Sequence, residues 1–131
     1  MTSAFVWPVR VYYEDTDVSG VVYHANYLKY FERARTEWLR AQGLSQEKLR
    51  ADHGIAFTVA NMEIVFRSPA RLDDELEVVV RVVQRRAASL IFEQILRDTA
   101  RPQRILCQTT VRVGCVDVLN FKPRPLPEWG T

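Results

Sequence analysis

The sequence predicts a single α+β domain in which a five-stranded antiparallel sheet wraps around one long helix. The chain has 131 residues, of which 47% are apolar, so it is one domain in length and can bury a core without disulfides or a metal. One segment shows the three-to-four-residue apolar spacing of an amphipathic helix, and the other segments alternate apolar and polar residues as half-buried strands do.

The first strand is expected where apolar residues alternate with others between Phe5 and Tyr13, with Pro8 near its free end. Residues 14–20 combine three carboxylates with a serine and a glycine, which predicts a loop. After this loop the spacing becomes helical, through Tyr27, Phe31, Ala34, Trp38 and Ala41. We therefore expect a helix over residues 27–42, with Asn26 as its N-cap and Gly43 just beyond its end.

A second, short helix is expected over residues 46–52, between Ser45 and Gly54. Strands are expected next, and their apolar faces are Thr58, Ala60, Met62, Ile64 and Phe66; then Leu76, Val78, Val80 and Val82; and finally Ile105, Cys107, Thr109, Val111, Val113 and Cys115. Residues 89–97 form a further, less regular strand. Because the breaks between strands are too short for helical crossovers, consecutive strands should pair as antiparallel neighbours. Residues 121–131 contain three prolines and should form an extended tail of the single domain, 1–131.

Charge and composition exclude several classes of protein. The formal net charge is only +2, and the basic residues form no block along the chain, so a nucleic-acid partner is not expected. No apolar run approaches the ~20 residues of a membrane span. The first residues lack the pattern of a secretion signal, so we expect a cytoplasmic protein. Cys107 and Cys115 lie too far apart along one strand to form a disulfide. The two histidines, His24 and His53, have no ligand spacing, so no metal is expected.

The polar residues that are most informative about chemistry lie in residues 13–27, where a carboxylate-bearing loop directly precedes the long helix. Unpaired N–H groups and the positive dipole end at a helix start attract developing negative charge. Taken by itself, Asp17 could equally be one of the many loop carboxylates that stabilise a turn.

The same loop carries a resemblance to a known family. The loop and the start of the helix contain the pattern Asp15-x-Asp17-x-x-Gly20-x-Val22-Tyr23-x-x-x-Tyr27. This pattern resembles the 4-hydroxybenzoyl-CoA thioesterase family of hot-dog-fold enzymes. The longer string Tyr23-His24-Ala25-x-Tyr27, followed by Phe31-Glu32-Arg33-Ala34-Arg35, is similar to the Tol-Pal-associated acyl-CoA thioesterases within it.

The resemblance implies that Asp17 is the catalytic carboxylate, acting as nucleophile or as general base, and that the main-chain N–H of His24 polarises the thioester carbonyl. It also implies a substrate contact at Tyr23, and contacts to the phosphates of CoA near the turn that contains Arg85, Arg86 and Ser89. No cofactor or metal is implied. The aryl-CoA branch has an aromatic residue where this chain has His24, so short- to medium-chain aliphatic acyl-CoA is the expected substrate.

The family's fold implies a dimer joined edge to edge, paired again into a tetramer, with active sites between subunits. A carrier-protein thioester is a further expected substrate form. Two other readings remain open. One is a non-catalytic acyl-CoA or acyl-carrier binding or scaffold protein of the same fold, associated with envelope or lipid-synthesis proteins. The other is a hot-dog dehydratase, which would need a paired histidine and acid on helix and loop.

Overall fold

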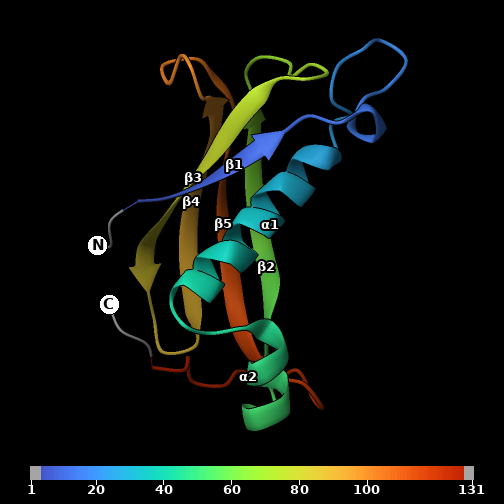
Figure 1. The fold of residues 1–131 in the computed structure, drawn as a ribbon. Helices are drawn as coiled ribbons and strands as arrows, with labels where there is room; N and C mark the ends of the chain where they lie inside the picture. The colour runs from blue at the N-terminus through green and yellow to red at the C-terminus, as the bar shows by residue number, and fades with distance from the viewer. Residues whose placement is uncertain (1–3, 129–131) are drawn as a thin grey trace.

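A computed structural model describes residues 4–128 of the chain, and Figure 1 shows one long helix lying across one face of a twisted sheet. The helices are α1 (Asn26–Ala41), α2 (Gln46–His53) and a short 3-10 turn, η1 (Tyr13–Asp15). The strands are β1 (Phe5–Arg10), β2 (Ile55–Phe66), β3 (Glu75–Arg85), β4 (Ser89–Asp98) and β5 (Ile105–Asp117). Within the described residues these strands form one antiparallel sheet in the order β1-β3-β4-β5-β2. The predicted α+β architecture is confirmed.

The strand order corrects one expectation. Strands β3, β4 and β5 pair with their neighbours in sequence, as predicted, but β2 pairs with β5 and β3 pairs with β1. The connection between β2 and β3 therefore crosses one end of the sheet. It is held there by the loop before α1, because Val22 N–H donates to the Ala70 carbonyl at 2.8 Å and Val21 forms a bridge with Arg71. These long-range bonds have no signature in the local sequence.

A bulge in β2 corrects a second expectation. The pairing with β5 shifts between Val59 and Asn61, and an extra residue reverses the alternation of faces beyond it. Met62 and Ile64 pack against the core after the bulge, as Phe57 does before it. Thr58 and Ala60 are exposed, so they do not share that face.

Helix α1 supplies the centre of the core. Its buried residues are Tyr27, Tyr30, Phe31, Ala34, Trp38 and Leu39. Ala41, predicted in this stripe, is exposed. The helix begins at Asn26 with Ala25 as its N-cap, so the predicted cap at Asn26 is wrong. The predicted short helix is confirmed as α2, since the Ser45 side chain accepts the Lys48 N–H and left-handed Gly54 ends it.

The proline-rich tail packs back onto the domain as far as the structure describes it. Arg124 N–H donates to the Cys115 carbonyl at 2.9 Å, Leu126 N–H donates to the Ala87 carbonyl at 2.8 Å, and Leu126 is buried. Residues 129–131 of the predicted tail lie outside the described residues. Cys107 and Cys115 are free and buried, and burial raises the pKa of the Cys107 thiol to about 12. No helix in residues 4–128 has the length and apolar character to cross a membrane.

Candidate active site

Asp17 sits on a tight turn between β1 and α1. The Asp17 N–H donates to the Val21 carbonyl at 2.9 Å, and the Gly20 N–H donates to the Asp17 carbonyl at 3.0 Å. Gly20 has a φ of 82°, the left-handed conformation that glycine adopts without steric cost. Figure 1 shows this loop projecting beyond the sheet beside the start of α1. The acidic loop of the sequence is therefore a defined turn that presents Asp17 to the outside.

The Asp17 side chain is exposed and is held by its own turn. Its Oδ1 accepts hydrogen bonds from the Ser19 N–H, at 2.9 Å, and from the Ser19 hydroxyl. These bonds, the hydroxyl first, lower the pKa of Asp17 below its ordinary value because they favour the charged form. The carboxylate is ionised at neutral pH, as a nucleophile or a general base must be.

The start of α1 leaves main-chain donors unused. The N-cap residue Ala25 has no side chain that could accept a hydrogen bond, and the first turn of the helix contains no acidic residue. The N–H of His24, just before the cap, donates to no acceptor within residues 4–128. The His24 ring instead lies against the ring of Tyr23, with centroids 4.5 Å apart. A positive helix end with free N–H groups can bind an oxygen that gains negative charge.

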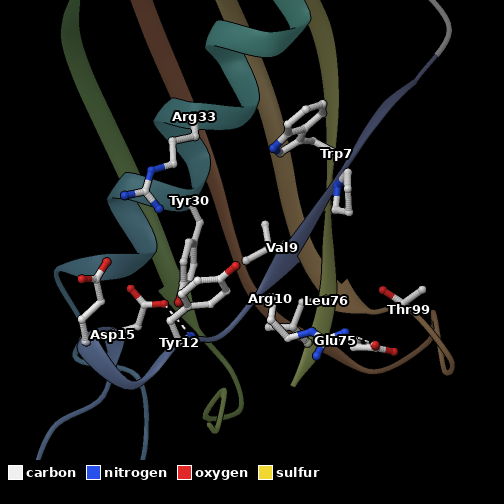
Figure 2. A pocket seen from close by; sticks show the side chains of 12 residues that line it. Trp7, Val9, Arg10, Tyr12, Asp15, Tyr30, Arg33, Glu75, Leu76 and Thr99 are labelled. Atoms are coloured by element: carbon white, nitrogen blue, oxygen red, sulfur yellow. Dashed lines mark hydrogen bonds and ion pairs between the residues drawn. The ribbon is translucent and has the colours of Figure 1, made fainter. Parts of the chain in front are cut away.

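A cavity of about 560 Å³ lies on the β1 side of α1, next to the same loop. Figure 2 shows its wall from Trp7 and Val9 on β1 to Tyr30 and Arg33 on α1. Neither Asp17 nor His24 lines this cavity. The Tyr30 hydroxyl is buried and makes no hydrogen bond of normal geometry. Burial raises the pKa of Tyr30, and the nearby Asp15 carboxylate raises it further. The cavity is therefore separate from the Asp17 turn, and the Asp17 side chain is exposed in the single chain.

The remaining predicted substrate contacts lie elsewhere in the chain. Arg85, Arg86 and Ser89 surround the β3–β4 turn, whereas the end of β1 that leads to Asp17 pairs with Glu75 at the other end of β3. The 11-residue strand β3 separates the two groups by roughly 33 Å at about 3.3 Å per residue. Arg85 donates to the Pro127 carbonyl at 3.2 Å, and Ser89 is buried. One chain does not bring these residues to Asp17.

One polar contact near the loop was not predicted from the sequence. The Tyr27 hydroxyl is buried and accepts the Ala70 N–H at 3.0 Å. Tyr27 was expected as a core residue by its spacing, and that is confirmed. The sequence offered one sign of this contact, the hydroxyl itself, because a buried hydroxyl needs a hydrogen-bond partner.

Within residues 4–128 no three His, Cys, Asp or Glu side chains converge as metal ligands would.

Comparison with known proteins places the chain in a family. The model of the thioesterase-like superfamily matches residues 11–130. The chain belongs to the thioesterase-like superfamily. The acyl-CoA thioester hydrolase YbgC of Escherichia coli is 49% identical over 127 residues, which cover 97% of this chain and 92% of that protein. The acyl-CoA thioesterase YbgC of Haemophilus influenzae is 44% identical and covers 98% of this chain and 92% of its own length.

Solved structures of the thioesterase-like superfamily agree with the fold. A probable thioesterase from Bartonella henselae superposes with a TM-score of 0.89 at 35% identity, covering 95% of this chain and all of that one. A 1,4-dihydroxy-2-naphthoyl-CoA thioesterase from Synechocystis superposes with a TM-score of 0.88 at 26% identity, covering 95% of this chain and 90% of that one. The predicted hot-dog fold and the predicted class of enzyme, a thioester hydrolase, are confirmed.

Proposed function

We propose that this thioesterase-like protein hydrolyses acyl-CoA thioesters to a free acid and CoA, with Asp17 as the reacting carboxylate. The observation that carries the proposal is one loop that holds both an ionised carboxylate at Asp17 and an unpaired main-chain donor at His24, at the positive end of α1. The YbgC relatives named as acyl-CoA thioester hydrolases, at 44% and 49% identity over nearly the whole chain, support the choice of substrate class.

In this mechanism the thioester carbonyl oxygen accepts a hydrogen bond from the His24 N–H, which stabilises the negative charge that develops on it. The Asp17 carboxylate either attacks the carbonyl carbon or removes a proton from an attacking water. As a nucleophile, Asp17 displaces CoA to form a mixed anhydride with the acyl group, which a water then hydrolyses to the free acid and the Asp17 carboxylate. As a base, Asp17 takes a proton from the water whose oxygen bonds to the carbonyl carbon while the carbon–sulfur bond breaks. In both routes the thiolate takes up a proton, so the products are the carboxylic acid and CoA. Both roles of Asp17 remain open because both require the same ionised oxygen.

We place the acyl group beside Tyr23, which is half-exposed next to His24. A short- to medium-chain aliphatic acyl group fits this position, because a histidine stands where the aryl-CoA branch has an aromatic side chain. A carrier-protein thioester presents the same reacting bond and is included as a substrate. The Tol-Pal association and the 4-hydroxybenzoyl-CoA subfamily stay predictions. The buried free thiols at Cys107 and Cys115 support a reducing compartment, the cytoplasm.

We propose that the active form is a dimer joined along β2, which then pairs into a tetramer. Both β1 and β2 are edges of the sheet. The six-residue β1 contains Pro8, which cannot extend a ladder, whereas the twelve-residue β2 contains no proline. Val59, Val65 and Phe66 on β2 are exposed. Pairing of two β2 edges would cover them. It would also allow the Arg85 and Arg86 turn of one subunit to serve the CoA phosphates near Asp17 of another.

The test is thiol release from acyl-CoAs of graded length, with Asp17→Asn as the blank. We expect the wild type to release CoA and Asp17→Asn to lose at least ~10²-fold in kcat, as removal of a general base does. The variant should keep its fold, because the Ser19 bonds to Asp17 are on an exposed turn. Wild-type activity in Asp17→Asn would contradict the assignment of this residue.

The same assay separates an enzyme from the alternative, a binding or scaffold protein of the same fold. A binding protein would retain acyl-CoA without releasing thiol over a long incubation.

Light scattering on the wild type gives the molecular mass and tests the dimer and tetramer, since a 15.2 kDa species would contradict both.

A further inference from the structure

We propose that Asp15 is a positioning residue for the reaction: it fixes the Asp17 turn relative to the start of α1. This inference rests on the proposed function, because its readout is the catalytic step. Asp15 is two residues before Asp17 but plays a different part in the structure. It is buried, whereas Asp17 is exposed, so Asp15 is not presented to a substrate.

The oxygens of Asp15 accept three hydrogen bonds from three different places along the chain, and the Asp15 N–H donates a fourth to the Tyr12 carbonyl at 3.0 Å. Its Oδ2 accepts the Tyr12 N–H at 2.9 Å, on the entry side. Its main-chain carbonyl accepts the Tyr23 N–H at 2.9 Å, on the exit side. Its Oδ1 accepts the Asn26 Nδ2 at 2.9 Å, from the first residue of α1. The loop that carries the proposed chemistry is therefore closed at its base through one residue.

The side-chain bonds of Asp15 are costly to lose. A buried carboxylate is tolerated only when hydrogen bonds replace its water, and both oxygens of Asp15 are engaged. Figure 2 shows the carboxylate turned toward Tyr12 at the edge of the cavity. Removing either donor leaves a buried, charged oxygen without its partner, so the loop would have to move to hydrate it.

The placement of these bonds connects them to the reaction. Asp17 follows Asp15 by two residues, and His24 precedes Asn26 by two residues. The bond between Asp15 and Asn26 thus fixes the base from which the carboxylate and the oxyanion donor both extend. A displacement of about 1 Å between reacting groups can reduce a rate by ~10²-fold. Loosening this bond should lower kcat and leave KM nearly unchanged.

The polarity of the bond offers a swap that separates positioning from chemistry. In Asn26→Asp two carboxylates face each other, so the bond to Asp15 loses its donor and the two negative charges repel. In the double variant Asp15→Asn/Asn26→Asp, the amide at position 15 accepts from Tyr12 and donates to the carboxylate at position 26. Both hydrogen bonds are restored with the donor reversed. A carboxylate near a helix start is also favourable.

We measure kcat and KM for acyl-CoA hydrolysis by wild type, Asn26→Ala, Asn26→Asp and the double variant. Both single variants should lose at least ~10-fold in kcat with KM within about 3-fold, and the double variant should return to within about 3-fold of the wild type. Asp52→Asn, an exposed Asp-to-Asn change on α2, is the matched control and should leave both constants unchanged. Circular dichroism verifies the fold of each variant.

The outcomes separate this inference from the proposed function. A wild type without thiol release overturns the proposed function, and the inference with it. An active wild type with Asn26→Ala at full kcat overturns the positioning role alone. If Asn26→Asp fails to fold, the double variant and Asn26→Ala still decide. A folded double variant with no recovery of kcat means that the Asp15 carboxylate is needed for itself, and the inference is wrong.

Discussion

The hydroxyl of Tyr27, on the first turn of α1, accepts a hydrogen bond from the main-chain N–H of Ala70 at 3.0 Å, and both residues are buried. The Ala70 carbonyl in turn accepts the N–H of Val22 at 2.8 Å. The helix, the β2–β3 connection and the exit of the Asp17 loop are therefore joined by two consecutive hydrogen bonds. This contact holds the exit of the loop at Val22, independently of the Asp15 bonds.

We expect Tyr27→Phe to destabilise the protein by about 1–3 kcal/mol, because the buried Ala70 N–H loses its acceptor without any gain elsewhere. Urea unfolding measures the change. Tyr30→Phe is the matched control on the same helix: its hydroxyl is buried but makes no hydrogen bond of normal geometry, so its removal should cost clearly less. Equal losses in the two variants would show that the Tyr27–Ala70 bond contributes nothing specific.

We expect Ser19→Ala to raise the pKa of Asp17 toward its ordinary value, because the Ser19 hydroxyl is the largest cause that lowers it. Activity needs the ionised carboxylate, so kcat/KM falls as the pH drops through this pKa. The acidic limb of the pH profile should therefore move to higher pH in the variant. Carbon NMR titration of the Asp17 carboxyl group gives the pKa directly, and an unchanged titration would rule out this role for Ser19.

We expect His24→Ala to retain kcat/KM within about 10-fold of the wild type, well above the ~10²-fold or greater loss in Asp17→Asn. The reason is that the proposed donor is the main-chain N–H, which alanine keeps, and that the imidazole lies against Tyr23. Steady-state thiol release on the two folded variants makes the comparison. A histidine variant as inactive as Asp17→Asn would mean that the imidazole itself takes part.

Much of the fold was predictable because hydrophobic periodicity is a local property. The helix spacing that begins at Tyr27 and the alternation along Leu76–Val82 report directly which faces are buried. The bulge after Val59 was not predictable, because an extra residue in a strand becomes visible only against the register of its partner, β5. Asn26 was misplaced as a cap for a related reason: its side chain finds Asp15, eleven residues earlier, instead of the helix N–H groups.

By itself, the sequence determined the α+β class, the order of the elements, the loop that holds Asp17 and His24, and the family to which that loop points. These follow from composition, spacing and a contiguous motif. Only the tertiary structure decided that β2 pairs with β5, that Asp15 closes the loop, and that Arg85 and Asp17 lie at opposite ends of β3 in one chain. Strand pairing and buried hydrogen bonds depend on residues far apart in the sequence, because each must find its partner among all the surfaces that folding brings together.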